Sequence, residues 1–126
     1  MKKVVSSPLA PAPIGPYSQG IRSGNMVFLS GQIAIDPKSG DLLMDDIEIE
    51  THRVMKNIEA LLKSEGLGFQ HIVKSSIFLS DMGLFLEMNK VYGSYFNELP
   101  PARETVAVAG LPKGVNVEIS VIAIAT

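Results

Sequence analysis

The sequence contains no cysteine. Without thiols, the chain can form no disulfide, no thiolate nucleophile and no thiolate metal site. The segment after Met1 has two lysines and a short polar stretch instead of the apolar core of a signal peptide. No run of residues approaches the ~20 apolar positions that a membrane span requires. These features fit a reducing compartment, and we expect a cytoplasmic protein with no membrane partner.

Clustered positive charge is also missing. The chain has 13 acidic and 11 basic residues, which gives a formal net charge of -2. Its longest basic run is Lys2-Lys3, whereas proteins that bind phosphate backbones use several clustered lysines or arginines. There is no tryptophan, and three tyrosines and five phenylalanines are few for a surface that stacks bases. We therefore expect no nucleic-acid partner.

Apolar residues are plentiful. Of the 126 residues, 46% are hydrophobic and 19% are charged, which suits one domain over residues 1–126. A chain of this size buries about two thirds of its unfolded surface. The apolar excess suggests that part of the surface contacts another subunit.

Hydrophobic periodicity predicts two helices. The first runs from about Ile47 to Glu65, and Gly66 ends it. Asp81 is expected to cap the second helix, which ends near Phe96. Their apolar stripes are Val54, Met55, Ile58, Leu61 and Leu62 in the first helix, and Leu84, Phe85, Met88, Val91, Tyr92 and Tyr95 in the second.

Alternating and β-branched segments predict strands. Gly31 is expected to mark a bulge or a close approach of the backbone to another group. Val73 is expected to share one strand face with Ser75 and Ile77. The last strand becomes apolar on both faces, as a central strand does. The assigned segments are Met26–Ser30, with Gln32–Ile35 as its continuation or partner, Ile72–Leu79, Ala102–Ala109 and Val115–Ala125.

The element order is β-β-β-α-β-α-β-β. It predicts an α+β fold in which two helices cover one face of a mixed, six-stranded sheet. No third helix remains to cover the other face. Self-association through the sheet, preferably in a closed ring, would cover it.

Common catalytic motifs are absent. His52 and His71 have no metal-binding spacing, and surface or capping roles suit them better. The glycines Gly66 and Gly68 follow a helix instead of opening one, so they form no phosphate loop. No serine lies in a nucleophile motif. We expect neither a metal nor another cofactor.

Two charged strand residues are the candidates for chemistry. Arg103 begins an apolar strand, where its planar fork either holds a ligand carboxylate or pairs with a structural acid such as Glu98 or Glu118. Glu118 lies in the middle of the last strand. A partly buried carboxyl there would have a raised pKa and could transfer protons. The alternative is a solvated strand face that Glu118 shares with Asn116 and Ser120.

Several segments together resemble the RidA/YjgF family along nearly the whole chain. The C-terminal pattern is Pro101-Ala102-Arg103 followed by Val117-Glu118-Ile119. The resemblance is specific because the matched blocks follow one another in the same order as in the family. The other matching blocks are Ala12–Gln19, Leu29-Ser30-Gly31-Gln32, Asn57-Ile58, Leu79–Met82 and Asn89–Phe96.

The resemblance implies a homotrimer with a chorismate-mutase-like fold and clefts between neighbouring subunits. It also implies hydrolytic deamination of 2-aminoacrylate, 2-aminocrotonate and related 2-imino acids to 2-oxo acids and ammonia. Arg103 would hold the substrate carboxylate, and Glu118 would position or activate the attacking water. The residues expected to line the cleft are Tyr17, Ser30, Gly31, Asn89 and Thr105.

Three positions depart from the commoner family pattern, and one of them is Ala34, which stands where a proline is frequent. Glu104 stands where a small residue is usual, although strand alternation should point it away from the cleft. Thr105 stands where many members have a cysteine, so thiol chemistry is impossible here. A negative charge at Glu104, next to Arg103 in the sequence, could change which substrate is preferred.

Two other functions remain open. The same cleft could bind 2-oxo acids without turnover, as a regulatory module, since fold does not determine function. The family also has an older label of translation initiation inhibitor or ribonuclease, against which the acidic balance argues.

Overall fold

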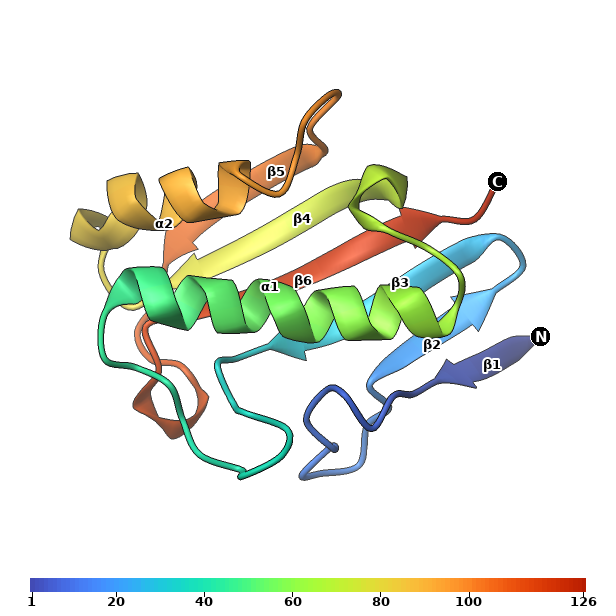
Figure 1. The fold of residues 1–126 in the computed structure, drawn as a ribbon, viewed down its shortest axis with the longest axis horizontal. Coiled ribbons are helices and arrows are strands. Elements are labelled where there is room, and N and C mark those ends of the chain that lie inside the picture. Colours follow the sequence, from blue (N-terminus) through green and yellow to red (C-terminus); the bar gives the residue numbers. More distant parts are fainter.

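The structure, a computed structural model, describes residues 1–126. Both helices lie over the same side of one sheet (Figure 1). We call this side the covered face and the other side the open face. The strands are β1 (Lys2–Val5), β2 (Gly20–Ser23), β3 (Met26–Gln32), β4 (Ile72–Leu79), β5 (Ala102–Ala107) and β6 (Val117–Ile124), and the helices are α1 (Ile47–Ser64) and α2 (Phe85–Gly93).

The sheet has the strand order β1-β2-β3-β6-β4-β5. β4 and β5 are parallel and are joined through α2, whereas every other neighbouring pair is antiparallel. β6 lies at the centre, as its apolar second half predicts. The predicted α+β class, with a mixed six-stranded sheet and two helices on one face, is confirmed.

α1 follows the predicted stripe. Asp46 caps it, because its Oδ1 accepts a hydrogen bond of 2.7 Å from the Ile49 N–H. The helix ends at Ser64, and Gly66 takes the left-handed φ of 73° that turns the chain away. All five predicted stripe residues of this helix are fully buried. α1 thus supplies a continuous apolar face to the core.

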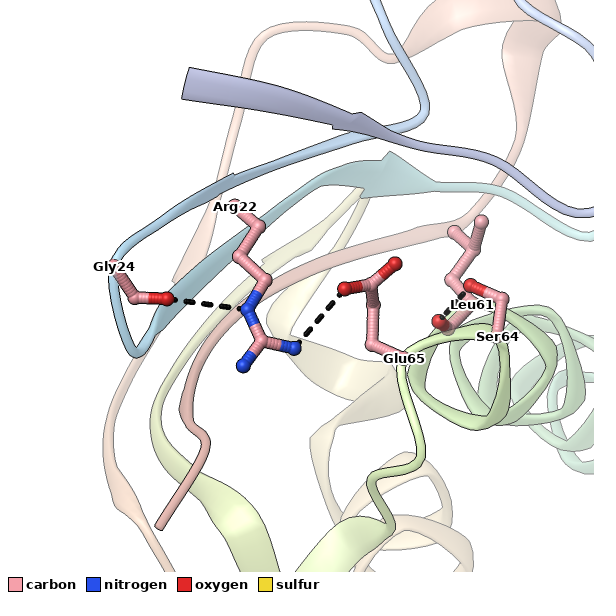
Figure 2. A network of polar contacts seen from close by, with 5 residues as sticks. All are labelled: Arg22, Gly24, Leu61, Ser64 and Glu65. Atoms are coloured by element: carbon pink, nitrogen blue, oxygen red, sulfur yellow. Dashed lines mark hydrogen bonds and ion pairs between the residues drawn. The ribbon is translucent and has the colours of Figure 1, made fainter. Parts of the chain in front are cut away.

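The end of α1 is tied to β2 by Arg22 (Figure 2). Its Nη1 lies 3.1 Å from Oε1 of Glu65, and its Nε donates to the carbonyl oxygen of Gly24. Ser64 Oγ donates to the carbonyl oxygen of Leu61 and satisfies one of the last helical acceptors. Arg22 thereby fixes the outer strands relative to the helix layer.

α2 is shorter than predicted. Asp81 accepts a hydrogen bond from the Gly83 N–H and caps a 3₁₀ turn, Met82–Leu84, so α2 begins only at Phe85. Beyond Gly93 the amides of Tyr95 and Phe96 bond three residues back, which tightens the chain out of the α-helix. Both side chains still pack against the core. No helix in the chain combines the length and apolar character needed to cross a bilayer.

The predicted bounds Ile72–Leu79 are confirmed by β4, but the face predicted for Val73 and the bounds of other strands were wrong. A register shift between Ile72 and Lys74 turns Ile72 into the core and leaves Val73 44% exposed. Beyond Gln32 the chain leaves the sheet, and only Ile35 forms an isolated bridge, to Leu42. The fifth and sixth strands are shorter than predicted, and no residues had been assigned to β1 and β2.

Side-chain alternation makes the two faces of the sheet different. Along β6, Val117, Ile119, Val121 and Ala123 are buried beneath the helices, so the residues between them point to the open face. Phe28 and Val106 are 39% and 43% exposed on that face. The chain therefore leaves an apolar sheet surface without a cover of its own.

A buried carboxylate, which the sequence did not reveal, anchors the start of β6. Glu50 on α1 is fully buried. Its Oε2 accepts the backbone N–H groups of Asn116 and Val117 at 2.7 and 3.1 Å, and its Oε1 accepts Asn116 Nδ2 at 2.9 Å. These bonds are why β6 begins at Val117 and not at Val115.

Replacing Glu50 should destabilise the fold. Glu50→Ala leaves two buried backbone donors without partners, at roughly 1–3 kcal/mol each, so we expect the free energy of unfolding in urea to fall by ~3 kcal/mol. The matched control is Glu48→Ala, an exposed position in the same helical turn, which should cost ~0.5 kcal/mol. Equal losses in the two variants would contradict the role of Glu50.

Candidate functional site

Glu118 faces a cavity of about 370 Å³. The cavity lies between the N-terminal loop, the end of β3 and the open face of β6. Tyr17, Ser30 and Gly31, three of the residues predicted to line a cleft, line it together with Glu118. The remaining lining is mainly apolar and consists of Pro11, Ala12, Ile14, Gln19, Gln32, Ile33, Ile35 and Pro112.

Gly31 makes room for the Glu118 carboxylate. The pairing of β3 with β6 shifts register between Leu29 and Gln32, so Gly31 lies in a bulge. A Cβ at Gly31 would overlap Oε2 of Glu118. Both predictions for this glycine, a bulge and a close approach, are confirmed.

Glu118 has the environment of a proton-transfer group. The side chain is half-buried, and none of the three ion pairs in the chain includes it. Burial raises the pKa of its carboxyl above the ordinary value for glutamate. The alternatives of an internal pair with Arg103 and of a fully solvated carboxylate are therefore wrong. A carboxyl with a raised pKa holds its proton more readily than an ordinary glutamate, which suits a group that donates and accepts protons.

Two buried amides hold the loops around this cavity. Nε2 of Gln19 donates to the carbonyl oxygens of Ser7, Ala10 and Pro11, at 2.8 to 3.2 Å. On α1, Nδ2 of Asn57 donates to the carbonyl oxygens of Ile33 and Ile35, both at 3.1 Å. The sequence does not predict the hydrogen bonds of these two amides, because each amide bonds to backbone that lies several residues away along the chain. The cavity wall is thus rigidly supported before any ligand enters.

Arg103 lies in a second, smaller cavity of about 310 Å³ between β5 and α2. Its Nη1 donates to Oδ1 of Asn89 at 2.7 Å, so these two predicted residues are brought together. The guanidinium takes part in no ion pair, which rules out the pairing with Glu98. An unpaired guanidinium with one hydrogen bond retains most of its five donors for an anion.

Thr105 lies on the same face of β5 as Arg103. Its Oγ1 is buried and has no hydrogen-bond partner in the chain. A buried hydroxyl without a partner is uncommon and costly. The same burial closes the hydroxyl off from the Arg103 cavity, whose lining does not include Thr105, so its place in a binding site stays a prediction.

Glu104 points away from Arg103, as strand alternation predicts. Its Oε1 lies 2.8 Å from Nζ of Lys74, and its Oε2 accepts a hydrogen bond from Ser76. The hydrogen bonds from Lys74 and Ser76 lower the pKa of the Glu104 carboxyl. All three residues belong to the open face, so Glu104 does not compete with a ligand for Arg103.

The two candidate residues lie on opposite faces of the sheet. Arg103 contacts α2 and is on the covered face, whereas Glu118 alternates with the buried residues of β6 and is on the open face. Asn89 and Thr105 accompany Arg103, and the other predicted residues accompany Glu118. Within one chain, the predicted site thus consists of two separate halves.

The chain matches the model of the family described as Endoribonuclease L-PSP over residues 7–125. It belongs to the YjgF/RidA family. A RutC family protein from Pyrococcus horikoshii is 47% identical over 98% of each chain. The 2-iminobutanoate/2-iminopropanoate deaminase of Mus musculus is 40% identical over 98% of this chain and 92% of its own.

Solved structures of YjgF/RidA relatives share the whole fold. A putative endoribonuclease from Thermotoga maritima superposes with a TM-score of 0.97 at 45% identity, over 100% of this chain and 99% of its own. The E. coli protein TdcF, solved with bound serine, has a TM-score of 0.94 at 36% identity, over 98% and 99% of the two chains. In this chain, no group of three or more His, Asp or Glu side chains is arranged to hold a metal ion.

The raised pKa of Glu118 should make stability depend on pH. When a carboxyl has a higher pKa in the folded state, stability falls as pH rises from the unfolded toward the folded pKa. Glu118→Gln removes this cost, so we expect it to raise the free energy of unfolding at pH 8 but not at pH 4. Urea titrations at one protein concentration measure the difference. The control is Glu98→Gln in an exposed loop, which should show no such gain. A gain of equal size at pH 4 and pH 8 for Glu118→Gln would contradict the raised pKa of Glu118.

Proposed function

We propose that this chain hydrolyses 2-imino acids and their enamine tautomers, such as 2-aminocrotonate and 2-aminoacrylate, to 2-oxo acids and ammonia. The observation that carries the proposal is an uncompensated guanidinium, at Arg103, in a chain whose Glu118 carboxyl has a raised pKa. The first group suits a substrate carboxylate, and the second suits proton transfer. The name of the mouse relative supports this activity.

The active cleft is formed between two copies of the chain. Since Arg103 and Glu118 lie on opposite faces of one sheet, a single substrate reaches both only when one copy supplies each half. The uncovered apolar face gives the copies a reason to associate. A homotrimer built around the open faces closes the arrangement and contains three equivalent clefts.

The reaction needs only positioning and proton transfer. In the protonated imine the carbon attached to nitrogen is already electrophilic, and an enamine reaches this state by taking a proton on its β-carbon. Arg103 binds the carboxylate by parallel hydrogen bonds, with Asn89 orienting the guanidinium.

Glu118 transfers the protons of the hydrolysis. As a carboxylate it takes a proton from water while the water oxygen bonds to the imine carbon, which gives a carbinolamine. As a carboxylic acid it returns that proton to the amino nitrogen, and the carbon–nitrogen bond breaks so that ammonia leaves. The Glu118 carboxylate then takes the hydroxyl proton as the carbonyl of the 2-oxo acid forms, and passes this proton to ammonia. A pKa raised above that of ordinary glutamate favours the return of the proton, and the fixed cleft supplies proximity.

Arg103→Ala should remove the acceleration of ammonia release from freshly generated 2-aminocrotonate. Two charge-assisted hydrogen bonds contribute roughly 3 kcal/mol, so we expect kcat/KM to fall at least ~100-fold. A stopped-flow assay measures the rate, with Lys63→Ala on the exposed side of α1 as control. Full activity of Arg103→Ala would refute the proposal.

The same assay separates the other candidate functions. If the wild type binds 2-oxobutanoate tightly but accelerates no imine, the chain is a binding module and not an enzyme. An RNA-cleavage arm tests the activity named in the description of the family model. Cleavage that persists in Arg103→Ala and Glu118→Gln would point to a function outside this cleft.

Mixed assemblies should recover activity. We expect Arg103→Ala and Glu118→Gln alone to keep at most about 1% of wild-type activity, whereas co-expressed chains purified through two different tags regain about one third of it. The reason is that a cyclic trimer with both variants has one cleft of three in which both halves are intact. Sedimentation confirms the oligomer; no recovery in verified mixed trimers would contradict a shared cleft.

A further inference from the structure

One buried polar pair lies directly beside Arg103 and has no part in the mechanism above. Ser75 on β4 is fully buried among apolar residues. Its side-chain partner is Tyr92 on α2, whose hydroxyl donates to Ser75 Oγ at 2.8 Å. A serine in a core costs stability unless it is hydrogen-bonded. Packing alone therefore does not explain why a polar pair lies at this place.

We propose that Tyr92, fixed by Ser75, is a positioning residue that holds the Arg103 guanidinium ready for the substrate carboxylate. This role rests on the proposed function, in which Arg103 binds the substrate carboxylate, and adds Tyr92 as the residue that positions Arg103. Ser75 and Arg103 are register partners on the parallel strands β4 and β5. Tyr92 therefore reaches two neighbouring positions of the sheet at once.

The guanidinium of Arg103 lies against the ring of Tyr92. The Cζ atom of Arg103 lies 5.1 Å from the centre of the Tyr92 ring and 5.6 Å from that of Phe85. Phe85, Asn89 and Tyr92 are spaced four and three residues apart along α2 and so share one helix face. Together they surround Arg103 with two aromatic rings and one amide.

This surrounding stabilises the positive charge without neutralising it. Aromatic faces attract a cation within about 6 Å of the ring centre. They do not occupy the N–H donors in the plane of the guanidinium, which stay free for a carboxylate. Burial raises the pKa of the Tyr92 hydroxyl, so the phenol stays protonated and does not become an anionic partner. A carboxylate in the place of Tyr92 would instead compete with the substrate.

The hydrogen bond to Ser75 fixes the ring plane. A phenylalanine at residue 92 could stack on Arg103 but would lack the bond that sets its tilt. A leucine would remove the aromatic face altogether. The proposal therefore predicts a graded series in which Tyr92→Leu is more severe than Tyr92→Phe or Ser75→Ala.

Steady-state kinetics with 2-aminocrotonate and calorimetry with 2-oxobutanoate test the series. We expect Tyr92→Leu to raise KM and the Kd of 2-oxobutanoate about 10-fold, with kcat changed less than about twofold. The anchor acts on ground state and transition state alike, which is why KM carries the effect. Tyr95→Phe is the matched control, since it removes a tyrosine hydrogen bond, to His52, away from Arg103.

A double variant separates positioning from simple stability. Tyr92→Phe and Ser75→Ala each leave a buried polar group unpaired, whereas the Tyr92→Phe/Ser75→Ala double variant removes both groups. We expect the double variant to regain thermal stability while its KM remains raised about threefold. A KM that returns to the wild-type value together with stability would mean that the pair is only structural, and the proposal would fall.

The Arg103→Ala background gives the decisive comparison. If Tyr92 acts through Arg103, Tyr92→Leu should leave the residual kcat/KM of Arg103→Ala unchanged. An equal loss in both backgrounds would overturn the inference. Two further outcomes tell the inference apart from the proposed function. If Arg103→Ala loses its activity but folded Tyr92→Leu keeps the wild-type KM and Kd, only the positioning role of Tyr92 is refuted. If Arg103→Ala is fully active, the proposed function itself is refuted.

Discussion

Successive side chains of a β-strand point to opposite faces of the sheet, and this alternation governs the organisation of the molecule. On β5 it turns Arg103 toward α2, and on β6 it turns Glu118 away from both helices. Because the helices cover only one face, the two charged groups cannot meet within a chain. The uncovered face and the divided site both support the proposal that the cleft is shared between two copies of the chain.

Buried polar side chains then give each half its shape. Gln19 and Asn57 hold loop carbonyls around the Glu118 cavity, and Glu50 holds the backbone that leads into β6. Buried hydrogen bonds of this kind add little net stability, but their loss is expensive. They are suited to fixing loops in one arrangement, and a site that works by positioning depends on such fixed loops.

Much of the fold could be predicted from local sequence patterns. The stripe of α1, the central place of β6 and the bulge at Gly31 each follow from spacing or residue type within a short segment. Arg103 and Glu118 could be selected because charged residues in apolar strands need an explanation. The matched family segments supplied Tyr17, Ser30, Gly31 and Asn89, which line the two cavities.

Features that join distant segments could not be predicted. Glu50 bonds to backbone 66 residues away, and the partner of Ser75 lies on the following helix, 17 residues along the chain. Alternation within a strand gives the relative faces of its residues, but the face that meets the helices depends on tertiary packing and on bulges such as that at Ile72. The division of the site into two halves therefore emerges only in three dimensions.

The contact between Gly31 and Glu118 also constrains how such a chain can evolve. Any side chain at residue 31 would take the space that the Glu118 carboxyl fills. A lineage that acquired alanine at residue 31 would have to shorten or redirect residue 118 as well. These two positions, 87 residues apart in the sequence, should consequently change as a pair or remain unchanged together.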